Sequence, residues 1–411
     1  MLANQTSRRS AHLQVLRRDV WTVVMLALAP AVGLGIARFA YALVLPDMRA
    51  DLGWSYAEAG WMNTSNAAGY LLGALLCTRA IAMAGAFRVM VIGVWACVFA
   101  LVLCALAQQS VTLNAARGFA GVGGGLAFVS GGVLAAHIAQ RNPEHGALYL
   151  GLFYAGPGLG IFLSGITVPT VLALFGAGSW RIAWVALAGL SLVFSVSVMR
   201  SKVAEISTPE SEKDRVDHQP FALKMLPLLG GYLLFGAGYI AYMTFMIAWV
   251  RDGGGGAGFQ AAFWAAIGAA AMASPWIWAR LLKRLQHGHA FVALIGFTAL
   301  GAALPLASGG SNALFLSAVI FGAAFFAVVA STTVFVRRNL PAGRWAPAIG
   351  ALTVAFGIGQ MLGPVATGII TDYSGGLSGG LLASVLMLIA ACISGLFQRD
   401  LGAGASGATR D

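Results

Sequence analysis

The sequence predicts an all-α integral membrane protein with twelve transmembrane helices arranged as two six-helix pseudo-repeats. Three observations support this fold class. Of the 411 residues, 59% are hydrophobic and only 9% are charged, whereas a soluble domain carries about 25% charged residues. Long stretches contain no Asp, Glu, Lys or Arg, and the two halves of the chain share a pattern at a constant offset. This composition leaves too few charges for a water-facing surface, so it argues against soluble enzymes and nucleic-acid-binding modules.

The charge-free stretches are long enough to cross a bilayer, whose hydrocarbon core of about 30 Å requires about 20 helical residues. The longest stretch, 285–336, contains the turn-rich segment 308–312 and is therefore divided into two helices. The first apolar run is too long for a signal peptide and is followed by further spans, so we expect it to be retained. The twelve predicted spans are 20–46, 55–79, 88–107, 110–137, 145–173, 179–199, 221–250, 257–282, 289–307, 312–337, 345–371 and 377–397.

A polar stretch, 200–220, lies between the sixth and seventh spans and divides the chain into bundles 20–199 and 221–397. The segments 1–19 and 398–411 flank them. If both termini are cytoplasmic, the inside segments contain 20 of the 25 Lys and Arg residues, as the positive-inside rule favours. We therefore expect a cytoplasmic N-terminal segment, a cytoplasmic linker and a cytoplasmic tail.

The two bundles match when one is shifted by about 200 residues along the other. Parallel six-helix repeats are typical of secondary transporters, in which the substrate site lies between the halves. Each matched pair is weak alone, but the pairs occur in the same order at nearly one offset. They include Gly33 with Gly236, Arg79 with Arg280, Gly121 with Gly322, and Arg141 with Arg338.

Two motifs resemble those of the major facilitator superfamily, and the resemblance covers nearly the whole chain. The segment from Arg117 to Gly121 in the fourth span is similar to the RxxxG motif of that superfamily. The segment Gly156-Pro157-Gly-Leu-Gly160 in the fifth span is similar to its GPxxG motif, which is associated with antiporters. The element that normally follows the second span lacks its Asp in this chain. The segments 35–41, 45–46 and 69–73 look most similar to the YbfB/YjiJ-like branch.

The resemblance implies a major facilitator fold that alternates between inward-open and outward-open states. Small residues in its helices allow close approach, and a proline can kink a helix. We expect structural and gating roles for Gly121, Gly156, Pro157, Gly160, Gly363 and Pro364.

Arg38 and Arg117 lie within predicted spans, where a charged side chain costs about 2.5–3.5 kcal/mol and usually faces the protein interior. Their counterparts in the second repeat are Ala241 and Ala318, so neither charge belongs to the duplicated scaffold. Arg38 is a candidate substrate ligand. Alternatively, it extends to the outer interface or makes a structural ion pair. Arg117 is a candidate for substrate contact, or for coupling and for holding the fourth span.

Polar and aromatic residues inside the spans supply the remaining candidate substrate contacts. Asn63 and Asn66 lie on one face of the second span, and Tyr239 and Tyr242 lie in the seventh. Polar tips on these faces suit a cavity wall, although helix packing with interhelical hydrogen bonds explains them equally well. The further candidates are Tyr154, Trp264 and Gln360.

Carboxylates are absent from the centres of the spans. Glu58 and Asp372 lie near outer span ends and, with Arg117, are the candidates for ion coupling. Two buried positive charges thus face no obvious buried negative charge. This asymmetry leads to the hypothesis that the substrate is an anion.

The leading interpretation is a secondary active transporter that moves a small organic solute across the bacterial inner membrane, with proton-coupled antiport and efflux. An organic-anion uptake or exchange carrier is the alternative, and a transporter-like sensor without flux is a different class. A membrane-embedded enzyme would need a nucleophile–base pair or metal ligands, and the spans contain no such pattern. We expect a monomer in membrane lipid, with no cofactor, no metal and no nucleic-acid partner.

Overall fold

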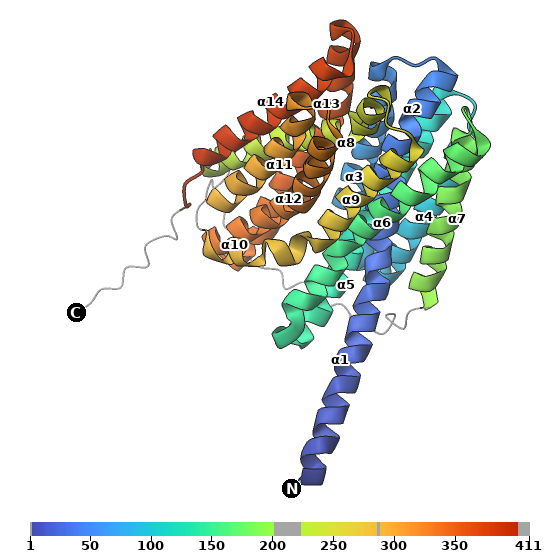
Figure 1. The fold of residues 1–411 in the computed structure, drawn as a ribbon. Helices are drawn as coiled ribbons and strands as arrows, with labels where there is room; N and C mark the ends of the chain where they lie inside the picture. Colours follow the sequence, from blue (N-terminus) through green and yellow to red (C-terminus); the bar gives the residue numbers. More distant parts are fainter. Residues whose placement is uncertain (1, 201–222, 286–287, 402–411) are drawn as a thin grey trace.

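The computed structural model describes residues 2–200, 223–285 and 288–401 (Figure 1). Apart from Arg200, the predicted linker 200–220 lies outside these residues, as does most of the predicted tail. The helices are α1 (Leu2–Pro30), the π-helix η1 (Ala31–Phe39), α2 (Tyr41–Leu52), α3 (Tyr56–Ala84), α4 (Ala86–Leu106), α5 (Ser110–Arg141), α6 (Gly146–Phe175), α7 (Trp180–Arg200), α8 (Leu226–Asp252), α9 (Ala257–Ile277), α10 (Ala279–Arg284), α11 (His289–Ala307), α12 (Ser311–Asn339), α13 (Trp345–Ser374) and α14 (Leu377–Leu396).

Within the residues that the structure describes, twelve helical segments are long and apolar enough to cross a membrane, which confirms the predicted fold class. We call α1–α7 the N half and α8–α14 the C half. The distal end of the bundle is where α2 leads into α3 and where α8 leads into α9. The terminal end, where α1 begins, lies opposite (Figure 1). The halves meet where α3 packs on α13, α6 on α9, and α2 on α8.

Helix 1, the segment from Leu2 to Leu52, is not a uniform α-helix. It passes through η1 and a turn at Ala40 before α2 begins, and the Leu43 amide donates to the Ala40 carbonyl at 3.1 Å, a tight i→i+3 bond. Single turns of π-helix are rare and often lie at functional sites. The sequence analysis predicted a single continuous span here, because the hydrophobic pattern does not reveal a change from α-helix to π-helix.

Small residues let helix 1 lie directly against α6. A side-chain carbon added at Gly156 would overlap the backbone carbonyl of Ala27, and one added at Gly160 would overlap that of Ala31. Close approach of helix backbones through small residues is characteristic of membrane helix packing.

We therefore expect Gly156→Ala to destabilise the protein by about 1–3 kcal/mol, the usual cost of an overpacked core. The control is Gly189→Ala on α7, where the added carbon meets nothing within 4 Å. That variant should be neutral or slightly stabilising, because Ala favours helix over Gly by up to about 1 kcal/mol. Thermal unfolding in detergent measures both. Equal unfolding temperatures for the two variants would contradict the packing assignment.

Candidate functional site

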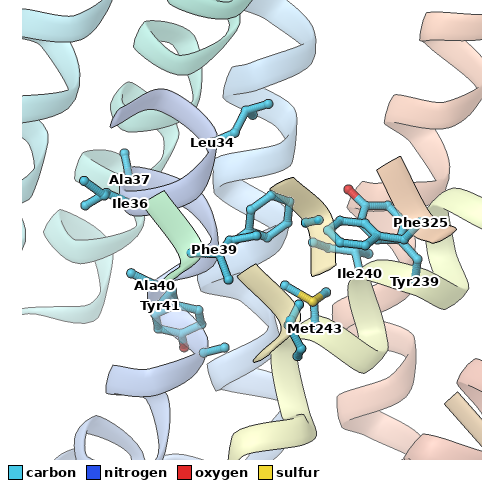
Figure 2. Packing of buried hydrophobic residues seen from close by; sticks show 14 of the residues in the cluster. Leu34, Ile36, Ala37, Phe39, Ala40, Tyr41, Tyr239, Ile240, Met243 and Phe325 are labelled. Carbon is cyan, nitrogen blue, oxygen red and sulfur yellow. The ribbon is translucent and has the colours of Figure 1, made fainter. Parts of the chain in front are cut away.

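A cavity lies between the two halves, inside the bundle. Its volume is about 50 Å³. Figure 2 shows the packing of buried residues in this region, in which Phe39 of the N half points toward Tyr239 and Phe325 of the C half. The lining residues are Leu34, Arg38, Phe39, Tyr70 and Phe128 from the N half, and Phe235, Tyr239, Phe325, Phe326, Val329, Phe356 and Gln360 from the C half.

Arg38 is the cation of this cavity. Its side chain is 3% exposed, and its guanidinium carbon lies 5.0 Å from the centre of the Tyr70 ring and 5.8 Å from that of Phe39. In the described part of the chain, Nε and Nη2 have no hydrogen-bond partner. No carboxylate is among the lining residues. The site therefore presents a buried positive charge with free donors.

Aromatic rings form most of the remaining wall. Tyr239 stacks on Phe356 with ring centres 5.6 Å apart and on Phe325 at 5.8 Å. The Phe39 ring meets the Phe325 ring edge-on at 6.2 Å. Gln360 Nε2 donates to the Tyr239 hydroxyl, whereas Gln360 Oε1 is buried with no partner in the described structure. The cavity thus combines ring faces with one free amide acceptor.

Arg117 lies behind this cavity and holds helix 1. The side chain is fully buried. Nη1 donates to the carbonyl of Ala37, and Nη2 donates to the carbonyl of Arg38 at 3.1 Å and to Oδ1 of Asn63 at 3.0 Å. Its guanidinium also lies over the Tyr41 ring at 5.1 Å. Arg117 therefore stabilises the backbone next to the turn at Ala40 and does not line the cavity.

The two predicted asparagines extend this network rather than the cavity wall. Asn63 Nδ2 donates to Thr244 Oγ1 of the C half at 2.6 Å. Asn66 Nδ2 donates to the backbone carbonyl of Arg117 at 3.0 Å. Both side chains are buried, so they match the interhelical alternative that the sequence left open.

Three other candidates lie outside the cavity lining. The Tyr242 hydroxyl pairs with Ser317 at 2.6 Å inside the C half. Trp264 is fully buried and lies beside Gly165, where α9 meets α6. Tyr154 is 45% exposed and packs on the cavity residue Phe128 with ring centres 6.0 Å apart. Of the predicted contacts, the structure brings Arg38, Tyr239 and Gln360 together.

Glu58 and Asp372 lie at the distal end, where they cap the first turn of α3. Glu58 forms a capping box with Ser55. Asp372 reaches across from the C half and accepts from the amides of Tyr56 at 2.8 Å and Ala57 at 2.9 Å. The Tyr56 hydroxyl donates to Asp252 Oδ2 of the C half at 3.3 Å. We call Tyr56, Ala57, Asp252 and Asp372 the distal latch, because these contacts join the halves.

The predicted gating residues lie at close backbone contacts. An added carbon would overlap the Asn66 carbonyl at Gly121 and the Ala237 carbonyl at Gly363. The carbonyls of Pro157 and Pro364 occupy the corresponding space beside Gly35 and Gly60. Pro364 and Gly60 belong to different halves, so their contact lies at the interface between the halves.

The sequence analysis missed most of the ring wall. Phe325 and Phe326 are adjacent in α12, and Phe321 lies one turn before Phe325. This i, i+4 aromatic spacing is a usable signal, but apolar rings in an apolar span do not stand out by composition.

A second, larger space of about 470 Å³ lies at the distal end of the C half. It surrounds the loop Gly253–Gly256 and is lined by Trp249, Asp252, Phe259 and Leu314, among others. All its lining residues belong to the C half and none is cationic. It therefore does not lie on a path between the halves, and the smaller cavity is the better candidate site.

We expect Arg117→Met to lower the free energy of unfolding by about 3 kcal/mol or more. The substitution leaves several buried acceptors without donors, and each such acceptor costs about 1–3 kcal/mol. Arg117→Lys keeps the positive charge but not the planar guanidinium with its several donors, so it should lower the free energy of unfolding by an intermediate amount. Thermal unfolding in detergent tests this order. If Arg117→Met were as stable as the wild-type protein, the contacts of Arg117 would contribute nothing to stability.

Comparisons with known proteins agree with this geometry. The family model described as "Uncharacterised MFS-type transporter YbfB" matches residues 30–395. The inner membrane transport protein YdhP of Escherichia coli (strain K12) is 26% identical over 385 residues, covering 90% of this chain and 93% of YdhP.

Two solved structures share the fold at low identity. The nucleoside transporter NupG has a TM-score of 0.69 at 15% identity, covering 92% of this chain and 97% of NupG. A bacterial homologue of the human lysosomal transporter Spinster, in an inward-facing and unoccupied conformation, has a TM-score of 0.67 at 14% identity, with coverage of 92% and 97%. The chain belongs to the YbfB-type family of major facilitator superfamily membrane transporters.

Proposed function

We propose that this protein is a secondary active transporter that moves a small organic anion by alternating access. The observation that carries the proposal is the cavity between the halves, in which Arg38 presents free donors and no protein carboxylate lines the wall. A buried charge is strongly unfavourable unless it is paired. A solute anion would supply the missing partner, because charge-assisted hydrogen bonds from Arg are among the strongest in proteins.

The distal latch supports alternation between two states. In this structure it joins α3 to α13 and α8 at the distal end. Opening toward that end would break the cap that Asp372 places on α3. New contacts formed on closure of the terminal end would have to offset the loss of this cap, so that the two conformations have similar free energies.

We further propose that a proton is the coupling ion and that transport is efflux by exchange. Asp372, the coupling candidate at the latch, places its carboxylate at the N-terminus of α3, where the helix dipole favours a negative charge. The GPGLG segment in α6, which resembles an antiporter motif, favours this direction. We also propose a monomer in the bacterial inner membrane with both termini cytoplasmic, from the positive-inside distribution.

Uptake or exchange of organic anions is the second candidate. One observation favours it: none of the lining residues is a carboxylate or histidine that could carry a proton through the cavity. An exchanged counter-anion would neutralise Arg38 in each direction of the cycle without a proton.

The first test is transport by purified protein in proteoliposomes that contain a pH dye, with a panel of organic anions and cations. We expect an anion to drive proton movement, and Arg38→Gln to reduce that flux at least tenfold. Arg251→Gln, a change at an exposed arginine, is the control. Anion flux without proton movement would select the exchange carrier. If only cations were transported, and if Arg38→Gln left that transport unchanged, the proposed anion site would be contradicted.

The second test concerns the latch. Spin labels at Gln108→Cys and Asn312→Cys, both exposed at the distal end, report the separation of the halves after the native cysteines are replaced by serine. Loss of a helix cap costs about 1 kcal/mol, or about fivefold in an equilibrium constant. We expect Asp372→Ala to shift the distance distribution toward the open state by about that factor, and Glu144→Ala at the terminal end to leave it unchanged. Identical distributions would rule out a latch.

A further inference from the structure

We propose that the cavity selects a planar aromatic monocarboxylate that carries a hydrogen-bond donor on its ring, as 4-hydroxybenzoate does. This inference rests on the proposed function and specifies the class of anion that the site accepts. It combines three features of the cavity: a free guanidinium edge, a wall of aromatic rings and a free amide oxygen.

The free donors of Arg38 fit a carboxylate. Nε and Nη2, the two unpartnered nitrogens, lie on the same edge of the planar guanidinium. Two parallel N–H groups on one edge match the two oxygens of a carboxylate, which is the bidentate arrangement that Arg favours. The cation–π contacts with Tyr70 and Phe39 leave this edge available while they hold the group.

The charge of the cavity suits a solute that carries a single negative charge. Among its twelve lining residues, Arg38 is the sole cation and no residue is acidic. A second carboxylate or a doubly charged phosphate would bring an uncompensated charge into an apolar site, at a high desolvation cost. The cavity therefore favours a monoanion over a dicarboxylate.

The wall fits a flat ring. Eight of the twelve lining residues are Phe or Tyr. The planes of Tyr239 and Phe356 are within 5° of parallel, and those of Phe235 and Phe356 within 16°. These rings stack on one another, so a solute ring would meet the cavity-facing surface of the stack, and such an aromatic contact is worth about two- to tenfold in affinity beyond apolar burial.

The size of the cavity limits that solute to one ring. A volume of about 50 Å³ holds only a few waters, at about 10–15 Å³ for each. A benzoate is larger than this space, so its binding requires the wall side chains to move apart, and a flat single ring requires less movement than a puckered or fused ring system.

Gln360 adds a preference for a ring donor. Its Nε2 is already used by the Tyr239 hydroxyl, and its buried Oε1 accepts nothing. A hydroxyl or amino group on the solute ring would satisfy this acceptor. Sites built to hydrogen-bond a hydroxyl discriminate strongly against analogues that lack it, because the buried group is then left unpaired.

Binding to the purified protein is the direct test, since protonated benzoic acids also cross bilayers unaided. Calorimetry and thermal stabilisation at pH 7.5 would compare 4-hydroxybenzoate, benzoate, cyclohexanecarboxylate, phthalate, 4-hydroxybenzyl alcohol and tyramine. We expect 4-hydroxybenzoate to bind about tenfold more tightly than benzoate, and benzoate about fivefold more tightly than cyclohexanecarboxylate. Phthalate, the neutral alcohol and the cation should each bind at least tenfold more weakly than 4-hydroxybenzoate.

Two variants assign these preferences to residues. Gln360→Leu should remove the preference for 4-hydroxybenzoate over benzoate, lowering their affinity ratio from about tenfold to about one. Phe356→Leu should remove most of the preference for benzoate over cyclohexanecarboxylate. Phe99→Leu, at a 56% exposed position on α4, is the matched control and should change neither ratio.

The outcomes separate this inference from the proposed function. Equal binding of benzoate and cyclohexanecarboxylate, or stronger binding of phthalate, would overturn the aromatic monocarboxylate and leave an organic-anion transporter standing. Failure of every aromatic acid to bind folded protein would also overturn it, whatever the flux assay shows. Binding of tyramine alone would overturn both proposals.

Discussion

Arg117 binds the backbone of helix 1 beside the turn at Ala40, and the position of the cavity charge depends on that contact. Its guanidinium donates to the carbonyls of Ala37 and Arg38. Arg117 therefore fixes the backbone of Arg38, whose own side chain lines the cavity. One buried arginine thus positions another. Arg117 uses both Nη atoms in hydrogen bonds and leaves only Nε without a partner in the described residues, whereas Arg38 leaves Nε and Nη2 free. Because buried polar groups are nearly always satisfied, this contrast supports the proposal that Arg38 is the cation that binds the solute.

A few polar contacts also hold the distal end. The first turn of α3 takes its caps from Glu58 on its own helix and from Asp372 on the opposite half. Helix termini need such partners in every conformation, so a cap borrowed from the other half ties helix stability to the relative position of the halves. Gly60 and Pro364 bring the backbones together beside it. The interface is therefore close-packed yet held by few polar contacts, which suits the alternation between two states that we propose.

The sequence was sufficient to predict twelve spans, because length and charge-free composition suffice where lipid is the solvent. It also singled out Arg38, Tyr239 and Gln360, since a polar group in an apolar span is conspicuous. It could not place Asn63, whose partners Arg117 and Thr244 come from distant parts of the chain. Nor could it find the π-helix or the ring wall, because winding and ring orientation follow from tertiary packing rather than from hydrophobic period. Asp372 was expected to act in coupling, and its capping contact depends on a neighbour more than 300 residues away.

The central claim is that Arg117 holds helix 1 so that the free edge of Arg38 receives the carboxylate of a solute. A crystal structure with 4-bromobenzoate bound tests it most directly, since anomalous scattering locates the bromine. The account predicts the carboxylate on Nε and Nη2 of Arg38 and the bromine inside the cavity, beside Gln360. A bromine peak in the space around Gly253–Gly256, or an Arg38 paired with a protein carboxylate or carbonyl, would contradict it.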